Sequence, residues 1–423
     1  MARKMKDSGI EWIGEIPEGW EVLAHKYIMH KEKSICEHYS GEDVISLTLN
    51  GVVKRDLENP FGKMPTTFDG YQFVDPNDLL LCLFDIDVTP RCVGLVKDYG
   101  VTSPAYSRFK IHSGFCNAYY NYLLRFIDDE KVFVHLSKNL RSSLTESDFG
   151  AIKTIVPPKA EQQRIADYLD NRTFEIDTLL SKARSSIEEY KKLKQAVITQ
   201  AVTKGVRGER EMKDSGVDWI GEIPKEWEIK RLKSFCTIVD CKNRTPDVFP
   251  DGKYTVVRTT CIKDCSFSYE GSYQTDTTNF KAWTLKGQPH KGDIFFTREA
   301  PVGEACLVPN ADNLCMGQRV MFFRPEDNSD ARYIMYSIYG PLVREYIASK
   351  NSGSTVGHLK LGQVACIPIF YCPPLEQKEI ADYLDAKYAE IDRLIAKKEQ
   401  LVKELEGYKK SLIYEVVTGK REV

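Results

Sequence analysis

Apolar residues recur with helical spacing in two long stretches of the chain, residues 160–204 and 375–419. In the first stretch, successive seam positions lie 4, 3, 4, 3, 7 and 4 residues apart, which is a heptad pattern. Its members are Ile176, Leu180, Ala183, Ile187, Tyr190, Val197 and Ala201. The second seam comprises Ile391, Ile395, Lys398, Val402, Leu405, Lys409, Leu412 and Val416. Each stretch predicts one helix roughly 65 Å long, at about 1.5 Å per residue.

The two stretches are copies of each other, 215 positions apart and identical at 18 of 45 positions. Their shared core reads EQQRIADYLD at 161–170 and EQKEIADYLD at 376–385. A helix of this length cannot bury its apolar stripe alone, so the copies are expected to pair with each other. The alternative is two unrelated amphipathic helices, each lying on its own domain. Lysine interrupts both seams at the equivalent positions Lys194 and Lys409.

A second repeat opens each half of the chain: MKDSGIEWIGEIPEGWE at 5–21 and MKDSGVDWIGEIPKEWE at 212–228, identical at 13 of 17 positions. The offset here is 207 rather than 215, so the duplication runs through each half and the middles differ by eight residues in net length. Trp12, Trp20, Trp219 and Trp227 are expected to anchor a loop to a core. Stacking on nucleic-acid bases is the alternative.

Short apolar runs between turn residues fill the middle of each half and predict strands. The candidates are residues 44–49, 79–84 and 119–127 in the first half and 254–262, 293–298 and 319–324 in the second. Residues 332–349 read as a helix disturbed by one proline. Prolines at 157–158 and 373–374 mark a hinge before each long helix. The predicted fold class is α+β, divided into globular domains at 1–156 and 208–372 and helices at 157–207 and 373–423.

Length and composition fit a soluble protein with two globular domains: 423 residues, 42% hydrophobic and 28% charged. No apolar run is long enough for a membrane helix and the N-terminus lacks a signal peptide, so we expect a cytoplasmic location and no membrane partner. The 12 cysteines include no CxxC pair; Cys261 and Cys265 are the nearest to one, and we predict no metal site. The net charge of −2 excludes a uniformly basic coat but not a local basic face.

Motifs of catalysis are missing from the sequence. There is no phosphate loop, no GxGxxG, no HExxH and no GxSxG nucleophile elbow. Asn59-Pro60-Phe61 is similar to the Asn-Pro-Pro-aromatic motif of amino-methyltransferases, but it lacks the second proline and reads as a turn. Acidic pairs such as Asp85 and Asp87 read as solvated loop charges. We therefore predict no catalytic residue and no cofactor bound by this chain.

Polar and basic residues cluster in loops at similar relative positions of both halves, which suits DNA recognition. Arginine reads guanine, Asn and Gln read adenine, and Ser, Thr and Lys hold phosphates. A protein built from two repeats would present two such DNA-recognition surfaces to two half-sites. The candidate DNA-binding residues are Lys54, Arg55, Arg91, Tyr106, Arg108, Arg141, Lys242, Asn243, Arg244, Arg258, Thr259, Arg298, Gln318, Arg319, Ser354, Thr355 and His358.

The two openers, the run SLTESDFGAIKTIVPP at 143–158 and the two EQ-x-x-IADYLD helices closely resemble the specificity subunit of type I restriction-modification systems. The resemblance runs from end to end of the chain. Two turn-plus-strand segments, Asn77-Asp78-Leu79 and Gly292-Asp293-Ile294, also match across the halves, 215 positions apart.

The resemblance implies two target-recognition domains that each read half of a bipartite double-stranded DNA site, with a pseudo-twofold repeat of helices that pair as an antiparallel coiled coil. The helices would set the spacing and dock two modification subunits. Those subunits would use S-adenosylmethionine to methylate adenine at N6, and restriction subunits would add ATP- and Mg²⁺-dependent translocation and cleavage. The predicted helix-pairing and docking residues are Ile165, Leu169, Ile176, Leu180, Ile187, Val197, Ile380, Leu384, Ile391, Ile395, Val402 and Leu412.

Two further hypotheses stay open at the level of sequence. One is a self-sufficient DNA methyltransferase or nuclease with an unrecognised site. The other is a coiled-coil scaffold that binds only proteins. A test of the isolated chain for S-adenosylmethionine binding or DNA cleavage separates the first from a specificity subunit, and a change in one DNA half-site on arginine substitution separates the second.

Overall fold

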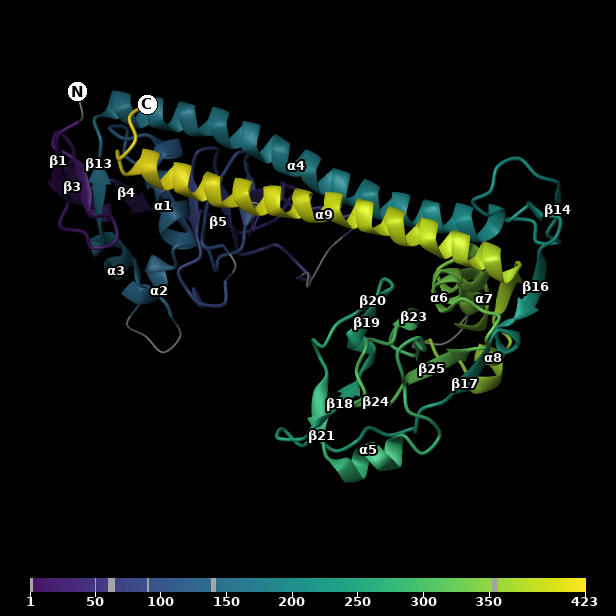
Figure 1. Cartoon of the computed structure of the whole chain (residues 1–423). Coiled ribbons are helices and arrows are strands. Elements are labelled where there is room, and N and C mark those ends of the chain that lie inside the picture. Colours follow the sequence, from purple (N-terminus) through teal and green to yellow (C-terminus); the bar gives the residue numbers. More distant parts are fainter. Residues whose placement is uncertain (1–2, 50, 60–64, 90, 138–141, 352–356) are drawn as a thin grey trace. The chain divides into compact units, whose positions relative to one another are not determined.

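A computed structural model describes residues 3–49, 51–59, 65–89, 91–137, 142–351 and 357–423. The chain forms two compact units, of which unit 1 comprises residues 1–183 and 400–423 and unit 2 comprises residues 184–399 (Figure 1). Two long helices, α4 (Lys159–Lys204) and α9 (Pro374–Val417), each contribute to both units. Each unit therefore combines a globular part with one segment of each long helix, and the four divisions predicted from sequence stay a prediction.

The globular part of unit 1 contains two larger sheets, two two-stranded sheets and several short helices. The four-stranded sheet has the order β10-β9-β12-β4 and the five-stranded sheet β5-β8-β11-β6-β7. The strands are β1 (Met5–Asp7), β2 (Glu15–Pro17), β3 (Glu21–Ala24), β4 (Met29–Lys31), β5 (Ile35–Cys36), β6 (Val44–Thr48), β7 (Gly51–Lys54), β8 (Tyr71–Val74), β9 (Leu79–Leu81), β10 (Val93–Leu95), β11 (Gly100–Thr102), β12 (Ser107–Ile111) and β13 (Lys153–Val156). The shorter helices are the 3-10 turn η1 (His25–Tyr27), α1 (Asn117–Asp129), α2 (Val132–Leu136) and α3 (Glu146–Ala151).

Unit 2 repeats this plan with different loops. Its larger sheet has the order β17-β25-β22-β23, and a three-stranded sheet has the order β21-β18-β24. The strands are β14 (Met212–Asp214), β15 (Glu222–Pro224), β16 (Glu228–Arg231), β17 (Cys236–Val239), β18 (Tyr254–Val257), β19 (Ile262–Lys263), β20 (Ser266–Phe267), β21 (Tyr273–Thr275), β22 (Ile294–Arg298), β23 (Val302–Leu307), β24 (Leu314–Met316), β25 (Val320–Pro325) and β26 (Pro368–Tyr371). The helices are η2 (Leu232–Ser234), η3 (Thr259–Cys261), α5 (Thr277–Trp283), α6 (Ala331–Ile338), α7 (Pro341–Asn351) and α8 (Leu361–Ala365).

Central strands are apolar on both faces because each lies between two cores. In β9, Leu79 and Leu81 belong to the main core of unit 1, whereas Leu80 belongs to a smaller core on the other face. In β22, Phe296 and Phe295 divide in the same way between two cores of unit 2. Alternation of side chains along a strand gives this division. It explains why these strands read as continuous apolar runs in the sequence.

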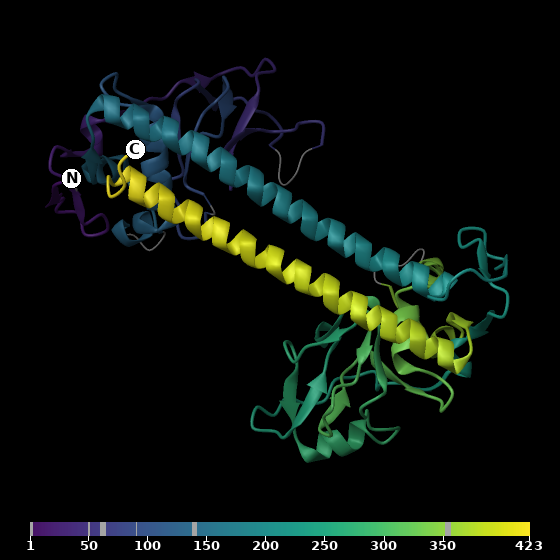
Figure 2. The same cartoon turned by 45° about the horizontal axis from the view of Figure 1, so that its top comes forward.

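The segments of α4 and α9 within each unit lie side by side and run antiparallel (Figures 1 and 2). In unit 1, Ile176 and Leu180 of α4 share a core with Leu412 and Val416 of α9. All four side chains are at most 6% exposed. The end of the chain therefore completes the core of the unit that contains its beginning. The predicted fold class, a mixed α and β protein with two long helices, is confirmed.

The two EQ motifs join each long helix to residues in or beside an opener and to the globular part of the same unit. Glu161 accepts hydrogen bonds from Arg3 at 2.6 and 3.0 Å and from Trp20 Nε1 at 3.0 Å. The equivalent Glu376 accepts from Arg210 at 2.5 Å. Burial alone would raise the pKa of Glu161, but the hydrogen bonds from Arg3 and Trp20 hold it below its ordinary value.

The glutamine of each motif makes a matching pair of backbone contacts. Gln162 accepts from Cys116 N at 2.9 Å and donates to Pro157 O at 2.8 Å. Gln377 accepts from Asp330 N at 3.0 Å and donates to Cys372 O at 2.9 Å. Each glutamine thus joins the start of a recognition-domain helix to the proline hinge before its own long helix. The repeated letters E and Q are explained by these internal contacts.

Most predicted strands and helices are present, and one is wrong. Residues 119–127 were expected as a strand but form part of α1. Buried Tyr119, Tyr120, Leu123, Leu124 and Ile127 follow one face of a helix, and the strand preference of tyrosine is overridden by this packing. The strand predicted at 254–262 is interrupted: its first four residues form β18, residues 259–261 form η3, and Ile262 begins β19. The helix predicted at 332–349 is two helices, α6 and α7, with Pro341 opening the second.

The opener tryptophans differ in their surroundings. Trp20 and Trp227 are completely buried, as expected of anchors. Trp12 is half-buried beside Phe126, with ring centroids 6.5 Å apart. Trp219 is 64% exposed, so the expectation that it anchors a core is wrong. Within the described residues, no helix combines the length and apolarity of a membrane span.

Candidate nucleic-acid interface

Arg298, the last residue of β22, lies where loops of unit 2 converge. Its Nη1 donates to both carboxylate oxygens of Asp240, at 2.9 and 3.1 Å, and its Nη2 donates to Asn243 Oδ1 at 3.2 Å. The Arg298 side chain is only 12% exposed. A two-pronged contact of this kind fixes the planar guanidinium, so Arg298 holds the loop after β17 in place.

The turn between β24 and β25 lies against the same loop. Gln318 Nε2 donates to Asn243 O at 3.3 Å, and Arg298 N donates to Arg319 O at 3.0 Å. Arg319 has a left-handed backbone, with φ +78°, and its guanidinium pairs with Glu299. Its side chain is still 46% exposed. The turn therefore presents two hydrogen-bonding side chains outward from a backbone that is tied to the sheet.

Aromatic and basic groups extend this surface toward α5. Lys242 Nζ lies 4.6 Å from the ring centroid of Trp283, and Arg244 Cζ lies 5.5 Å from it. Trp283 Nε1 donates to Arg244 O at 3.1 Å. His358 Nδ1 lies 2.9 Å from Glu299 on the opposite side of the turn. Cation–π contact steadies the two basic side chains while leaving their donors available.

We call this set the loop cluster, and its members are Lys242, Asn243, Arg244, Arg298, Gln318, Arg319 and His358. Four of them are permanent cations, whereas the carboxylates bound to them are Asp240 and Glu299. Asn243, Arg244, Gln318 and Arg319 are exposed. An arginine can donate two hydrogen bonds to guanine, and Asn or Gln can bond adenine in the same way. The cluster has the donors and the local positive charge that duplex DNA requires.

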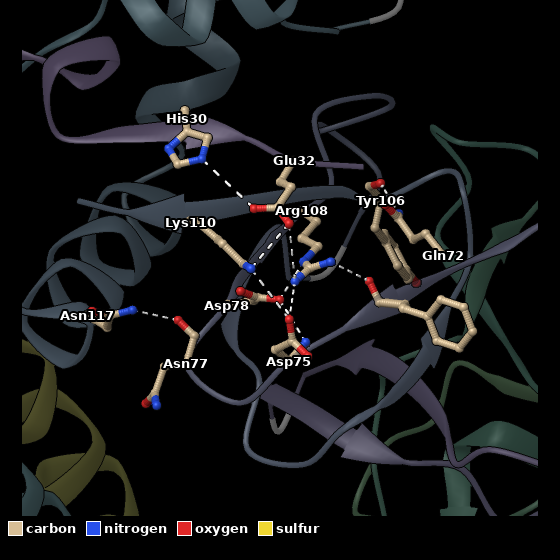
Figure 3. Close-up of polar contacts among 11 residues, drawn as sticks. His30, Glu32, Gln72, Asp75, Asn77, Asp78, Tyr106, Arg108, Lys110 and Asn117 are labelled. Carbon is tan, nitrogen blue, oxygen red and sulfur yellow. Dashed lines mark hydrogen bonds and ion pairs between the residues drawn. The ribbon is translucent and has the colours of Figure 1, made fainter. Parts of the chain in front are cut away.

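Arg108 of unit 1 lies in a different environment (Figure 3). Its side chain is 2% exposed, and it donates to Asp78 and Asp75 at 2.5 Å and to Phe73 O at 3.0 Å. Burial raises the pKa of Asp78, and the Arg108 guanidinium opposes that shift. The prediction that Arg108 contacts a base is corrected: every described contact of its guanidinium is internal, and it fixes the turn before β9.

The turn that Arg108 holds has a counterpart in unit 2. Asn77 and Gly292, 215 positions apart, both have left-handed backbones, with φ +73° and +96°. The aspartate that follows each accepts from a backbone N–H three residues earlier, at 2.7 Å for Asp78 and 2.9 Å for Asp293. In unit 2, Arg324 takes the place of Arg108 and bonds Asp293 at 2.7 and 3.0 Å. Glycine or asparagine stands where a side chain must tolerate positive φ.

Comparison with known proteins finds similarity to one family. Residues 224–404 match the family model described as type I restriction modification DNA specificity domain. The protein assigned as the specificity subunit of type I restriction enzyme MjaX, from Methanocaldococcus jannaschii, is 26% identical over 305 residues, which cover 71% of this chain and 67% of that protein. The MjaVIII specificity subunit of the same organism is 26% identical over 283 residues, which cover 64% of this chain and 63% of its own length.

Solved structures share the fold at low sequence identity. A chain from a structure titled for complex assembly and conformational transition of the type I R-M system superposes with a TM-score of 0.70 at 15% identity, covering 96% of this chain and 99% of that one. The HsdS subunit from Thermoanaerobacter tengcongensis gives a TM-score of 0.51 at 16% identity, covering 96% and 98%. Part of this chain therefore matches the specificity domain of type I restriction-modification systems, and the whole chain has the fold of the solved HsdS subunit. The resemblance stated from its sequence is confirmed.

The structure brings together only some of the predicted DNA-binding residues. Seven form the loop cluster of unit 2. Arg258 and Thr259 lie beside it, because the preceding residue, Val257, accepts a hydrogen bond at its carbonyl from Gly317 N at 2.8 Å. Arg258 also lines a groove with Lys191 and Lys194 of α4. Arg141, Ser354 and Thr355 lie outside the described residues. Their predicted roles stay predictions.

The candidates of unit 1 do not form one cluster among the described residues. Lys54 is exposed and pairs with Asp43 at 2.6 Å, and Arg55 is half-buried in the next position. Arg91 is 12% exposed and binds Asp129 at 2.8 Å. Tyr106 is half-buried, and burial raises its pKa. These residues come from separate loops, so DNA contact by them stays a prediction.

Most of the predicted helix-pairing and docking residues are buried inside the chain. The buried members are Ile165, Leu169, Ile176, Leu180, Ile187, Ile380, Leu384, Ile391 and Leu412, each at most 8% exposed, and the half-buried ones are Val197, Ile395 and Val402. Their burial within a single unit shows that they hold the protein's own helices and cores. A partner subunit cannot reach the buried ones, so any docking surface is made of other residues.

Sequence reasoning missed the acidic and aromatic partners of the loop cluster. Asp240 and Glu299 orient Arg298 and Arg319, and Trp283 supports Lys242 and Arg244. Trp283 is the one tryptophan outside the openers, which is a signal the sequence does offer. No local feature of the sequence points to Asp240 and Glu299, because the arginines that they bind are up to 58 residues away. Within the described ranges, no group of three or more His, Cys, Asp or Glu side chains could hold a metal ion.

Proposed function

We propose that this specificity subunit reads a bipartite DNA sequence, one half with each recognition domain, and that its long helices set the distance between the halves. The observation that carries the proposal is the loop cluster, where Asn243, Arg244, Gln318 and Arg319 are exposed around an internally fixed Arg298. Preorganised donors on a rigid sheet lose little entropy on binding, so they can discriminate base edges.

In this proposal the chain recognises the DNA sequence, and its partner subunits catalyse the reactions. Two modification subunits would bind S-adenosylmethionine and methylate adenine at N6, and restriction subunits would use ATP and Mg²⁺. The chain itself would bind no cofactor and would act in the cytoplasm with double-stranded DNA. Helices of 46 and 44 residues, continuous through both units, support the role of a fixed spacer.

The proposal is tested with the specificity subunit assembled with its modification subunit. Genomic DNA methylated by this complex is sequenced for N6-methyladenine, which gives the target and its spacing. The variants Arg319→Ala and Arg244→Ala are expected to relax one half of the target and leave the other half unchanged. For a contact to guanine the loss is about 1–3 kcal/mol at that base alone.

Lys225→Ala is the control, because this exposed lysine of the opener pairs with Glu211, away from the recognition loops. It should leave the target unchanged. Equal weakening of all sequences by Arg319→Ala would make Arg319 a phosphate contact. Methylation without any site preference would contradict the proposal, as would S-adenosylmethionine binding or DNA cleavage by the isolated chain.

A further inference from the structure

The two units build the same edge of their four-stranded sheets from equivalent residues. The order β10-β9-β12-β4 of unit 1 is matched by the order β23-β22-β25-β17 of unit 2. Leu144 N donates to Leu83 O at 2.8 Å, and Leu359 N donates to Arg298 O at 3.0 Å. Each residue of the second contact lies 215 positions after its counterpart in the first. Leu83 therefore occupies the place in unit 1 that Arg298 occupies in unit 2.

Strand pairing extends this correspondence to the turn before β12 and the turn before β25. Ser107 of β12 pairs with Leu81, and Met321 of β25 pairs with Phe296. Leu81 and Phe296 are again 215 positions apart, so Ser107 and Met321 are equivalent. The turns that precede them join equivalent strands with the same number of residues. The matching turn residues are Pro104 with Gln318 and Ala105 with Arg319.

Four polar side chains of unit 2 are replaced by apolar ones at the equivalent positions of unit 1. Arg298, Glu299, Gln318 and Arg319 correspond to Leu83, Phe84, Pro104 and Ala105, in that order. Phe84 is 40% exposed, and Pro104 and Ala105 are exposed as well. Val88, in the loop that follows β9, is 73% exposed. We call Phe84, Val88, Pro104 and Ala105 the apolar edge of unit 1.

The side chains of the apolar edge cannot donate hydrogen bonds to guanine or adenine, as those of the loop cluster can. In the major groove, thymine presents a methyl group, which apolar side chains contact. Asp85 and Asp87 are exposed in the same loop as Phe84 and Val88. Their carboxylates would repel the acceptor atoms of guanine and could accept from cytosine N4. Both features favour pyrimidines on the DNA strand that faces this edge.

Positive charge lies at a different position in each unit. In unit 2 the cation is Arg298, which Asp240 holds in place. Strand pairing makes Lys33 of unit 1 the equivalent of Asp240, and Lys33 is exposed. An exposed lysine beside an apolar surface can hold a phosphate group without reading the sequence. Unit 1 therefore combines a phosphate-binding cation with apolar groups for the bases.

We propose that unit 1 reads its half-site by apolar contact with thymine methyl groups, through Phe84 and Val88, whereas unit 2 reads its half-site by hydrogen bonds. This inference rests on the proposed function, which supplies a duplex with one half-site for each unit. Phe84 and Val88 determine specificity, and Lys33 positions the DNA backbone. The half-site of unit 1 is therefore expected to contain thymine on the strand that faces the apolar edge.

The experiment uses the complex with the modification subunit and duplexes that carry the target found by N6-methyladenine sequencing. The half-site that Arg319→Ala relaxes is assigned to unit 2, and the other half-site to unit 1. Each thymine is then replaced in turn by uracil, which lacks only the methyl group. One buried methyl group is worth about 0.8 kcal/mol, so uracil at a contacted position of the unit 1 half-site should raise the Kd about fourfold. Uracil in the unit 2 half-site should leave the Kd unchanged.

Variants of Phe84 connect the thymine effect to this side chain. Phe84→Ala is expected to raise the Kd about tenfold and to remove the further loss on uracil substitution at the thymine that Phe84 contacts, because the two changes remove the same contact. Phe84→Leu keeps an apolar contact and should keep part of the sensitivity to uracil. Tyr27→Ala is the matched control, because Tyr27 is 60% exposed and precedes β4, whereas Lys33 follows it. This control should change neither the Kd nor the effect of uracil.

Three results would overturn the inference and leave the proposed function standing. The first is a unit 1 half-site without thymine, and the second is a Kd that uracil changes at no position of that half-site. The third is a uracil effect that persists undiminished in both Phe84→Ala and Val88→Ala, because another side chain would then contact the methyl groups. A complex that binds all sequences equally would contradict the proposed function and the inference together.

Discussion

The ammonium group of Lys194 on α4 donates a hydrogen bond to Asp392 Oδ1 on α9 over 2.6 Å. Lys409 makes the equivalent contact to Asp177 in unit 1, also at 2.6 Å. Both members of each pair are separated from their counterparts by 215 positions, so one contact is the repeat of the other. The lysines that interrupt the two apolar seams therefore fix the register of one helix against the other.

We predict that this contact contributes to register more than to stability. Lys194 is 15% exposed and Asp392 54%, and half-exposed ion pairs are worth about 0.2–1 kcal/mol. Lys194→Asp should lower the midpoint of urea unfolding, because it opposes two carboxylates, and adding Asp392→Lys should restore part of the loss. A double-mutant cycle measures the coupling. The pair Lys191–Glu188, within one helix, is the control and should couple more weakly.

Stability of unit 1 should depend on pH through His25. This residue is 1% exposed, and burial lowers its pKa to about 4 from the usual 6.5, against one hydrogen bond with Phe149 O at 3.2 Å. The unfolded chain binds a proton at higher pH than the folded one, so stability is complete above pH 6.5 and falls between pH 6.5 and 4, by about 3 kcal/mol.

The second half of the chain supplies the matching variant. Leu232, 207 positions after His25, occupies the equivalent 3-10 turn and is fully buried. His25→Leu is therefore expected to flatten the loss of stability between pH 6.5 and 4 in urea titrations. His30→Leu, at an exposed histidine, should leave the profile unchanged. A parent protein whose stability is level across this range would show that His25 is not buried as described.

Arg108 and Lys110 should respond very differently to truncation. Arg108 is the charge partner of Asp78, and both side chains are at most 3% exposed. Removing one member of a buried pair leaves the other charge unpaired, so Arg108→Ala should cost about 3–5 kcal/mol in unfolding free energy. Lys110→Ala, at a side chain 36% exposed, should cost under about 1 kcal/mol. Specific loss of one base preference without loss of stability would restore Arg108 as a base contact.

Deleting residues 400–423 should damage unit 1 and spare unit 2. The deletion removes Leu412, Val416 and Val417, each at most 1% exposed, from the core of unit 1. It also removes the carbonyl of Val417 that accepts from Tyr119 Oη at 2.9 Å. Hydrogen exchange should show lost protection in α1 and retained protection in β22 and β25. Loss of partner binding by such a truncation would reflect the lost core.

The sequence predicts the fold well wherever the two halves repeat. The long helices and the openers could be aligned with each other, and the turns at Asn77 and Gly292 follow from the same comparison. The sequence predicts secondary structure less well where one residue type is compatible with both a strand and a helix. The tyrosines at 119 and 120 favour a strand locally, and only the packing of α1 on its sheet makes a helix of them.

The candidate DNA-binding residues could likewise be predicted only in part from the sequence. Arg108 lies in β12 and Arg319 immediately precedes β25, and nothing in their local sequence predicts which of the two is buried. Arg108 is buried because Asp78, 30 residues away, reaches it across the sheet. Arg319 stays exposed because its pairing with Glu299 occurs at the tip of a turn. Which arginine faces outward depends on partners that are distant in the sequence.

The unit that begins the chain is completed by the segment that ends it. Unit 2 is built from the continuous stretch 184–399, but the core of unit 1 lacks Leu412, Val416 and Val417 until that segment has been synthesised. During synthesis, the globule that leaves the ribosome first is therefore expected to reach its native state last. Its unfinished core stays exposed for the time that translation of the second half requires, a period in which apolar surface favours misassembly and chaperone binding.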